Sequence, residues 1–368
     1  MQVGFIYSPN LIQELDKNVK IRDRSQLVFS LINSYNLFHN ENLKLINPMK
    51  SDDKNLKLFH SQEYIDYLKS CQDEDHENEE DFGIGFDCPF LENLYDYATT
   101  IAGSSLTAAL LINQGLFNYV INWFGGWHHA KRDKASGFCY INDIVLCIMK
   151  LRQKFNRILY IDLDQHHGDG VQEAFEYTNK VLTLSIHKYM SGFFPGTGSL
   201  EDIGKGLGKF YSVNVPLKAG IDDRMFSQIF TTVYNRTIEV YQPEVMVVQC
   251  GADSLIGDPI DSLNPFNLTL EGYSNCVRQI LSTKIPTIFL GGGGYNFANS
   301  AKLWCKLTSV IVGQELNNDI PEHEYFLKYA PDYELNIGSG KNKNENTMEY
   351  IDKVVSTINN NLSNIKIY

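Results

Sequence analysis

Four short runs of β-branched, leucine and aromatic residues recur along the chain, and each leads into a glycine-rich or polar motif. The runs are Tyr119–Trp123, Arg157–Leu163, Glu244–Gln249 and Pro286–Leu290, and the motifs are GGWHHA, DQHHGDG, CGADS and GGGGYN. Apolar runs without alternation are typical of strands that are buried on both faces of a parallel sheet. The chain is therefore predicted to build such a sheet, with its unusual motifs at the strand ends.

Helical patterns fill the intervals between these runs, as at Asn142–Phe155 and Phe226–Tyr241. Strands that alternate with helices predict an α/β fold with helices on both faces of the sheet. In such sheets ligands bind at the carboxyl ends of the strands, which is where the motifs fall. Because the motifs extend from about residue 87 to residue 295, without an internal repeat or a Pro/Ser linker, we expect one domain over residues 1–368.

Composition excludes several classes of protein. Hydrophobic residues make up 43% and charged residues 21% of the 368 residues, which argues against global disorder and fibrous repeats. No run of 18 apolar residues predicts a spanning helix, and the N-terminal sequence predicts no secretory signal. The net charge of −12 without a basic stripe argues against nucleic-acid binding. Seven cysteines without a C-x-x-C motif indicate reduced thiols.

Part of the negative charge is local. Seven acidic residues are concentrated within nine positions: Asp73, Glu74, Asp75, Glu77, Glu79, Glu80 and Asp81. Such a run is typical of a solvated loop, and a site for a cationic partner is the alternative.

The segment Ile158–Gly170, ILYIDLDQHHGDG, carries the most chemical information. Side chains at alternate positions of a strand point the same way, so Asp162, Asp164 and His166 are expected to face one direction. Two carboxylates and an imidazole are ligands suited to zinc or a similar divalent ion. The alternative is a buried aspartate cluster held by backbone N–H groups, which is costly unless the charges are paired.

Adjacent histidines follow the first run. His128 and His129 lie in a glycine-rich turn, and five of the nine histidines fall between residues 128 and 187. A histidine held by a carboxylate can serve as a general base, and Asp162 and Asp169 are available for that purpose. Helix caps or hydrogen-bonded core histidines are the alternative for this pair.

The last two motifs add one ligand and one hydroxyl. Asp253 in GADS can supply a third protein ligand, although an aspartate after a strand is often a helix N-cap. GGGGY and GKGLG lack the context of a nucleotide-binding loop. The four glycines instead indicate close backbone approach, with Tyr295 presenting its phenol to the site or, alternatively, lying in the core. Together the motifs provide three metal ligands, a base and a hydroxyl donor, which suit metal-assisted amide hydrolysis.

Longer segments resemble the zinc-dependent histone deacetylases of class I. They are NWFGGWHHAKRDKASGFCYINDIV, ILYIDLDQHHGDGVQEAF, SIHKYMSGFFPGTG, VVQCGADSLIGDP and FLGGGGYNFANSAKLW, and the likeness continues through IPEHEYFLKYAPDYEL. The resemblance implies the arginase/deacetylase fold, with a single eight-stranded parallel sheet. It also implies hydrolysis of N6-acetyl-lysine in histones and other proteins, release of acetate, a role in chromatin and transcription regulation, and a location in the nucleus or the cytoplasm.

The same resemblance implies roles for individual residues. Asp164, His166 and Asp253 would bind one zinc ion. The catalytic groups would be His129 as general base and acid, His128 as electrostatic assistant, Asp169 and Asp162 as their respective orienting partners, and Tyr295 as donor to the oxyanion.

Further residues would handle the substrate and structural ions. Those expected to contact the substrate or its product are Asp87 at the rim, Gly137, Phe138 and Phe194 in an apolar tunnel, Trp127, Ile260, and Arg24 beneath the zinc. Monovalent K⁺ or Na⁺ sites would use Asp162, Asp164, His166, Ser185 and Ile186, and separately Phe175, Thr178, Val181 and Tyr211.

The sequence departs from the family pattern at a few positions. Pro259 and Ala298 stand where corepressor-bound members carry arginines near an inositol phosphate, so activity without a corepressor is expected. Phe86 replaces a rim tyrosine, Gln165 lies between two metal ligands, and Ile260 replaces Leu or Met in the tunnel. With no long charged tail after the PDY segment, the chain favours the short-tailed branch of class I.

Three rival functions remain in view. The first is an amidohydrolase of the same fold that acts on acetylpolyamines, longer acyl-lysines or small amides. Enzymes that act on polyamines carry a glutamate near the position of Ile260, so the isoleucine argues against a polyamine substrate. A two-metal ureohydrolase would need a second aspartate-rich cluster, and GADSL supplies one aspartate only. A catalytically dead scaffold would be expected to lose a ligand, His129 or Tyr295, and none is lost.

Overall fold

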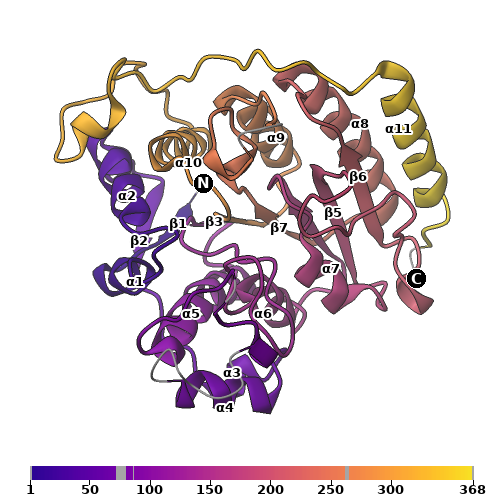
Figure 1. Cartoon of the computed structure of the whole chain (residues 1–368), viewed down its shortest axis with the longest axis horizontal. Helices are drawn as coiled ribbons and strands as arrows, with labels where there is room; N and C mark the ends of the chain where they lie inside the picture. The colour runs from indigo at the N-terminus through magenta and orange to yellow at the C-terminus, as the bar shows by residue number, and fades with distance from the viewer. Residues whose placement is uncertain (1, 72–79, 86, 262–264, 367–368) are drawn as a thin grey trace.

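The computed structural model describes residues 2–71, 80–85, 87–261 and 265–366. Its centre is one sheet of eight parallel strands in the order β2-β1-β3-β8-β7-β4-β5-β6 (Figure 1). The strands are β1 (Val3–Ile6), β2 (Leu43–Ile46), β3 (Tyr119–Asn122), β4 (Ile158–Asp162), β5 (Val181–Lys188), β6 (Ser212–Leu217), β7 (Val245–Gln249) and β8 (Thr287–Leu290). The expected eight-stranded parallel sheet is therefore confirmed.

The four predicted strands are neighbours in this sheet. They are β3, β8, β7 and β4, and each lies within one residue of its predicted limits at either end. Every residue of these four strands is buried, which explains why their sequences are apolar throughout. Strand β2, at one edge, exposes two of its four residues. Because the four strands are adjacent and parallel, the motifs that follow them meet at one edge of the sheet.

Helices cover both faces of the sheet, as expected (Figure 1). On one face α5 (Leu94–Asn113) packs against α6 (Asp143–Leu151), α1 (Pro9–Leu15) and α4 (Gln62–Ser70), and α6 also contacts α7 (Asp169–Phe175). The short α3 (Asp53–Leu56) joins this layer through Asp53, whose carboxylate contacts Lys69 and Tyr95. On the other face a continuous row of helices packs in the order α2 (Arg24–Ser34), α10 (Phe297–Val312), α9 (Leu270–Ser282), α8 (Asp223–Tyr241) and α11 (Met348–Leu362).

The two predicted helices are present with different ends. Helix α6 stops at Leu151 instead of Phe155, and Asn142 caps its first turn by accepting a hydrogen bond from the N–H of Val145. Helix α8 begins at Asp223, three residues before the predicted start, because the Asp222 side chain caps it. Polar caps set both N-termini, and only the cap of α8, Asp222, lies outside the predicted segment.

Several other predictions concern features outside the sheet. No helix in the described part of the chain is long and apolar enough to cross a membrane. All seven cysteines are buried. The acidic run lies largely outside the described residues, at 73–79, and so does Phe86.

The buried centre of the sheet is predicted to dominate stability. Leu159 in β4 is fully buried, whereas Leu45 in the edge strand β2 is 46% exposed. Replacing Leu159 with alanine should lower the free energy of unfolding by about 2–5 kcal/mol, because it removes apolar contacts and leaves a cavity. The matched Leu45→Ala variant should lose far less. Chemical denaturation of both variants measures the difference, and equal losses would contradict the burial assignment.

Candidate active site

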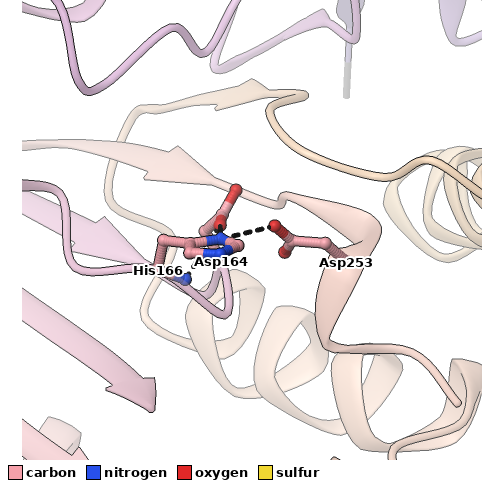
Figure 2. Close-up of side chains that lie close together, drawn as sticks. All are labelled: Asp164, His166 and Asp253. Carbon is pink, nitrogen blue, oxygen red and sulfur yellow. Dashed lines mark hydrogen bonds and ion pairs between the residues drawn. The ribbon is translucent and has the colours of Figure 1, made fainter. Parts of the chain in front are cut away.

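Three side chains at the carboxyl edge of the sheet form a group that can hold a metal ion. Ligand atoms of Asp164, His166 and Asp253 all lie within 4.8 Å of one another (Figure 2). The Nδ1 atom of His166 lies 2.8 Å from Oδ2 of Asp253 and 3.2 Å from Oδ1 of Asp164. Asp164 and His166 follow β4, and Asp253 lies in a short 3₁₀ turn, η4 (Ala252–Ser254), after β7. Asp253 is therefore placed beside the other two, although the sequence separates them by almost 90 positions.

Asp162 lies outside the group in which strand alternation predicted it. Strand alternation predicted that Asp162 would face the same way as Asp164 and His166, but Asp162 is not part of the group that can hold a metal. Strand β4 ends at Asp162, so the alternation stops there and the chain turns. Oδ1 of Asp162 instead accepts a hydrogen bond from the N–H of Asp164, at 3.1 Å.

Two glycines make room for the carboxylates. A Cβ atom at Gly251 would lie 1.9 Å from Oδ2 of Asp164, and one at Gly293 would lie 2.4 Å from Oδ2 of Asp253. The N–H of Gly293 also donates to Oδ2 of Asp164 at 3.0 Å. Close backbone approach, inferred from the GGGG motif, is thus confirmed.

The donor set fits a divalent cation. Two buried carboxylates lie side by side at the centre of the group. Burial and the nearby Asp164 raise the pKa of Asp253, because two negative charges in one apolar site repel each other. A cation bound between them removes that repulsion, and two carboxylates with one imidazole leave a coordination position open.

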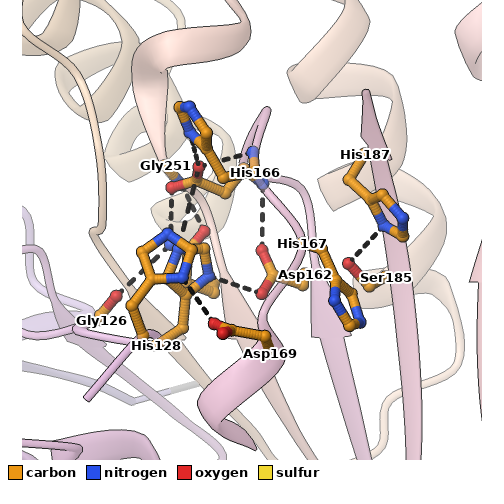
Figure 3. Close-up of polar contacts among 12 residues, drawn as sticks. Gly126, His128, Asp162, His166, His167, Asp169, Ser185, His187 and Gly251 are labelled. Carbon is orange, nitrogen blue, oxygen red and sulfur yellow. Dashed lines mark hydrogen bonds and ion pairs between the residues drawn. The ribbon is translucent and has the colours of Figure 1, made fainter. Parts of the chain in front are cut away.

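The paired histidines each contact a buried carboxylate. Nδ1 of His128 lies 2.8 Å from Oδ2 of Asp162 (Figure 3). Nδ1 of His129 lies 2.7 Å from Oδ1 of Asp169. Tyr160 donates its hydroxyl proton to the same oxygen of Asp162, at 2.6 Å. Both imidazoles therefore have one ring nitrogen held by a carboxylate. The centroids of the two rings lie 3.9 Å apart.

The two histidines differ in charge. Burial opposes protonation of His128, but Asp162 and Asp164 outweigh it and raise the pKa of His128 to about 9. Burial and the neighbouring charge of His128 lower the pKa of His129 to about 4, with Asp169 acting in the opposite direction. These surroundings favour the uncharged imidazole at His129, which can accept a proton, and the protonated form at His128.

A buried aspartate that the sequence analysis did not single out holds the histidine turn. The carboxylate of Asp143, at the start of α6, accepts hydrogen bonds from the N–H groups of Gly126 and Trp127, at 3.0 and 2.8 Å. Ser105 donates to the same carboxylate at 2.5 Å. The only signal in the sequence was an acidic residue in an otherwise uncharged and largely apolar segment, YINDIVLCI.

Two further polar residues were also missed. Gln249, the last residue of β7, donates from Nε2 to Oδ2 of Asp164 at 2.8 Å. Asp258 accepts the backbone N–H groups of Tyr295 and Asn296, at 2.6 and 3.0 Å, and so holds the turn that carries the phenol. A lone polar residue at the end of an apolar run was the available signal for Gln249.

A cavity of about 270 Å³ leads to these groups. Its lining includes most of the residues expected to contact substrate, namely Asp87, Gly137, Phe138, Phe194 and Ile260, together with His129, His166 and Tyr295. Phe194 contacts His129 edge-on with ring centroids 4.9 Å apart, and Phe138 contacts Tyr295 in the same way at 5.6 Å. Phe193 and Asp261, which were not predicted, also line the cavity.

A second, much smaller cavity lies deeper. It measures about 20 Å³ and is lined by both histidines, the three candidate ligands, Trp127 and Tyr295. Arg24 is buried nearby and donates from Nη1 to the carbonyls of Gly292 and Gly294, at 3.0 and 2.8 Å. Its guanidinium lies 6.0 Å from the ring centroid of Trp127.

Apart from Asp162, Asp164 and His166, the residues expected at monovalent ions lie on the β5 side of β4 or farther along the chain. Ser185 pairs with Asp162 across β4 and β5, its hydroxyl lies 2.9 Å from Nδ1 of His187, and Ile186 follows it in β5 (Figure 3). Of the second set, Phe175 ends α7, Thr178 lies in the turn before β5, Val181 begins β5, and Tyr211 directly precedes β6.

Fold and site together define an α/β protein with a candidate metal centre of hydrolase type. A model of the "Histone deacetylase domain" matches residues 19–311. Histone deacetylase 8 of Danio rerio is 44% identical over 99% of this chain and 96% of its own length, and that of Xenopus tropicalis is 43% identical over 98% of each. Histone deacetylase RPD3 of Saccharomyces cerevisiae is 44% identical over 93% of this chain and 79% of its own length.

The chain therefore belongs to the histone deacetylase family. Its similarity to histone deacetylase 8 over nearly the whole length agrees with the branch of class I that the sequence favoured. RPD3 has the same percentage identity to this chain as the Danio rerio protein, but the match covers a smaller share of its length, 79% against 96%.

The glycine beside the candidate metal site supplies a test that does not depend on activity. Gly293→Ala should reduce zinc affinity about 10–100-fold, because its Cβ would displace the Asp253 carboxylate. Zinc content after dialysis against a chelator of graded strength measures the change. Gly338→Ala is the matched control, since nothing lies within 4 Å of a Cβ there. Equal zinc retention in both variants would exclude this metal position.

Proposed function

We propose that the protein is a zinc-dependent lysine deacetylase that hydrolyses the acetyl amide of N6-acetyl-lysine in histones and other proteins. The proposal rests on one observation: a candidate metal triad, a histidine held by a carboxylate and a phenol line the same small, deep cavity. Amide hydrolysis needs an electrophile, a proton carrier and an oxyanion donor in one place, and this cavity supplies the residues for all three. Membership of the family supports the same reaction.

Asp164, His166 and Asp253 would hold the zinc ion. A zinc ion in such a site supplies Lewis acid chemistry, polarising a carbonyl oxygen and making water more acidic. Gln249 and the N–H of Gly293 hold the Asp164 carboxylate in position through hydrogen bonds. Orienting partners of this kind are part of what sets metal affinity.

His129 would move the proton. As an uncharged imidazole it accepts a proton from the attacking water and then delivers it to the departing lysine amine. Asp169 holds Nδ1, so the other ring nitrogen is the one free to exchange a proton. The protonated His128, held by Asp162, contributes positive charge beside the reacting carbonyl.

Tyr295 would stabilise the developing oxyanion. Burial and the nearby Asp253 raise the pKa of this phenol, so it stays protonated and can donate a hydrogen bond. Asp258 holds the backbone of Tyr295 and so keeps the ring at the cavity.

The lysine side chain would pass between Phe138 and Phe194, with Gly137 beside it and Asp87 at the rim. Ile260 lines the same cavity. Trp127 and Arg24 would lie at the pocket beneath the zinc ion through which acetate would leave. We also propose two structural K⁺ or Na⁺ ions. One would be held by Asp162, Asp164, His166, Ser185 and Ile186, and the other by Phe175, Thr178, Val181 and Tyr211.

Several broader assignments belong to the same proposal. The chain would act as one catalytic domain, in the nucleus or the cytoplasm, on acetylated protein or peptide substrates and without direct contact to nucleic acid or membrane. Because Pro259 and Ala298 offer no positive charge for an inositol phosphate, the enzyme would be active without a corepressor.

Tyr295→Phe provides the sharpest test of the mechanism. The substitution keeps the ring and removes the hydroxyl, so kcat for an acetyl-lysine peptide should fall about 10²–10³-fold. Zinc content and melting temperature should stay close to the wild-type values, because the phenyl ring still packs against Phe138. Acetate release, zinc content and melting temperature are measured on one preparation. A stable, zinc-loaded and fully active variant would remove Tyr295 from the mechanism.

Asp87→Ala tests the rim. One oxygen of Asp87 accepts the N–H of Gly137 at 2.6 Å, and the carboxylate also faces the cavity, where it can accept backbone N–H groups of a bound peptide. The variant should raise KM for acetylated peptides more than for a small acetyl-lysine analogue without those amides. Steady-state kinetics on both substrates measure the contrast. Equal effects would show that Asp87 does not contact the peptide backbone.

A further inference from the structure

The two aspartates that hold the paired histidines are themselves held in different ways. Asp162 is fully buried at the end of β4, where Oδ1 accepts a backbone N–H and Oδ2 accepts the hydroxyl proton of Tyr160. Asp169 begins helix α7, and among the described residues only the side chains of His129 and Lys131 bind its carboxylate through a hydrogen bond or an ion pair. The orientation of the Asp169 carboxylate therefore depends on Lys131.

Lys131 lies between two carboxylates on one face of α7. Its Nζ lies 2.6 Å from Oδ2 of Asp169 and 3.0 Å from Oε2 of Glu173, which is one turn farther along the helix. The other oxygen of Asp169, Oδ1, lies 2.7 Å from Nδ1 of His129. The lysine and the imidazole thus each hold one oxygen of the same carboxylate, and together they fix its rotation about the bond to Cβ.

The contact between Lys131 and Asp169 is sheltered from solvent. The Lys131 and Asp169 side chains are 15% and 10% exposed, whereas that of Glu173 is 63% exposed. Burial opposes ionisation of Asp169, but His129 and Lys131 outweigh it and lower the pKa of this carboxyl. Asp169 is therefore an ionised acceptor for both partners, and Glu173 is an outer partner of the lysine whose attraction water screens.

Backbone contacts dock the segment that carries His129 and Lys131 onto the start of α7. The N–H of Gly170 donates to the carbonyl of His128 at 3.1 Å. A Cβ atom at Gly170 would lie 2.6 Å from that carbonyl oxygen and 2.6 Å from the carbonyl oxygen of Ala130. Neither contact uses the ammonium group of Lys131. Loss of that group should therefore leave the backbone in place and change the freedom of the Asp169 carboxylate.

A separate cavity gives the carboxylate room to turn away from His129. This cavity, here called the outer cavity, measures about 460 Å³, and Lys131, Asp169, Glu173 and Lys205 are among the residues that line it. None of the residues proposed to contact the substrate lines it. Without the lysine, water in the outer cavity would compete with Nδ1 of His129 for the oxygens of Asp169.

We propose that Lys131 is a positioning residue, which holds the Asp169 carboxylate against Nδ1 of His129 and thereby keeps the His129 ring aligned for proton transfer. This proposal rests on the proposed function, in which His129 carries the proton. Lys131 does not line the cavity that would take the substrate, so it acts through Asp169.

Lys131→Met tests the proposal through steady-state kinetics. Methionine removes the ammonium group and keeps most of the apolar stem, so the Asp169 carboxylate is free to turn toward the outer cavity. The kcat for an acetyl-lysine peptide, per folded and zinc-loaded molecule, should fall about 10–100-fold, because the proton carrier is no longer aligned. KM should stay close to the wild-type value, because the substrate cavity is unchanged. Lys131→Gln replaces Lys131→Met if that variant does not fold. Lys131→Arg, which can still donate to Oδ2 of Asp169, should recover most of the lost kcat.

A double-mutant cycle asks whether Lys131 acts through Asp169. The kcat of the double variant Lys131→Met with Asp169→Asn should equal that of Asp169→Asn alone, because the lysine then has no carboxylate to hold. Lys205→Met is the matched control. Lys205 lines the same outer cavity and pairs with Glu176, which directly follows α7, but it does not bind Asp169. Its kcat should equal that of wild type.

Proton NMR of the zinc-loaded protein gives a readout that does not depend on turnover. The carboxylates accept hydrogen bonds from Nδ1 of His128 and of His129, so both Nδ1 atoms carry a proton that resonates far downfield. In Lys131→Met the His129 signal, assigned by its loss in His129→Gln, should broaden through exchange with water. The His128 signal is an internal control and should persist, because Tyr160 still holds Asp162. Lys131→Arg should keep both signals.

Three results would overturn the proposal. They are an unchanged kcat in Lys131→Met, an unchanged His129 signal in the same variant, and losses in kcat that multiply in the double variant. A zinc-loaded wild-type protein that hydrolyses no acetyl-lysine peptide would instead contradict the proposed function. The His129 signal would then still decide whether Lys131 holds Asp169 in place.

Discussion

Six aspartates lie buried around the carboxyl ends of neighbouring strands, and the structure depends on how their negative charges are compensated. Asp143 and Asp258 accept backbone N–H groups, while Asp162 and Asp169 hold the paired histidines. Asp164 and Asp253 face each other, which leaves them with a need for a cation. Compensation of these buried negative charges thus holds the turns in place, favours a protonated His128 and produces the candidate metal site.

The order of the strands in the sheet brings these buried aspartates together in one site. The four strands with apolar sequences are neighbours, so the motifs after them converge without long loops. Glycines at positions such as 251 and 293 then let backbone and carboxylates come closer than any side chain would allow. The bulky residues Phe138, Phe193 and Phe194 narrow the approach from outside.

Much of this arrangement could be predicted from the sequence. Uninterrupted apolar runs indicated parallel strands and placed the motifs at one edge, because burial on both faces leaves a plain compositional signal. Alternation failed at Asp162, since the strand ends there and periodicity no longer applies. Resemblance to known deacetylases, and not spacing, assigned individual roles such as that of Asp169. Asp143, Gln249 and Asp258 escaped notice, because hydrogen bonds to distant backbone groups leave no local pattern. Lys131 and Asp169 lie 38 positions apart, and only tertiary structure brings them together.

The strand order also bears on how the protein is made. Strand β3 pairs with β8, so Tyr119 can pair with Thr287 only after the ribosome has made β8. Strand β7 likewise has an unpaired edge until β8 is present. During synthesis β3 therefore leaves the ribosome with β1 as its neighbour on one side, and its other edge stays unpaired until β8, the last strand, emerges. Such non-local pairing slows folding and exposes partly built sheet to aggregation. A nascent chain of this kind is therefore most exposed to aggregation in the interval before β8 is made.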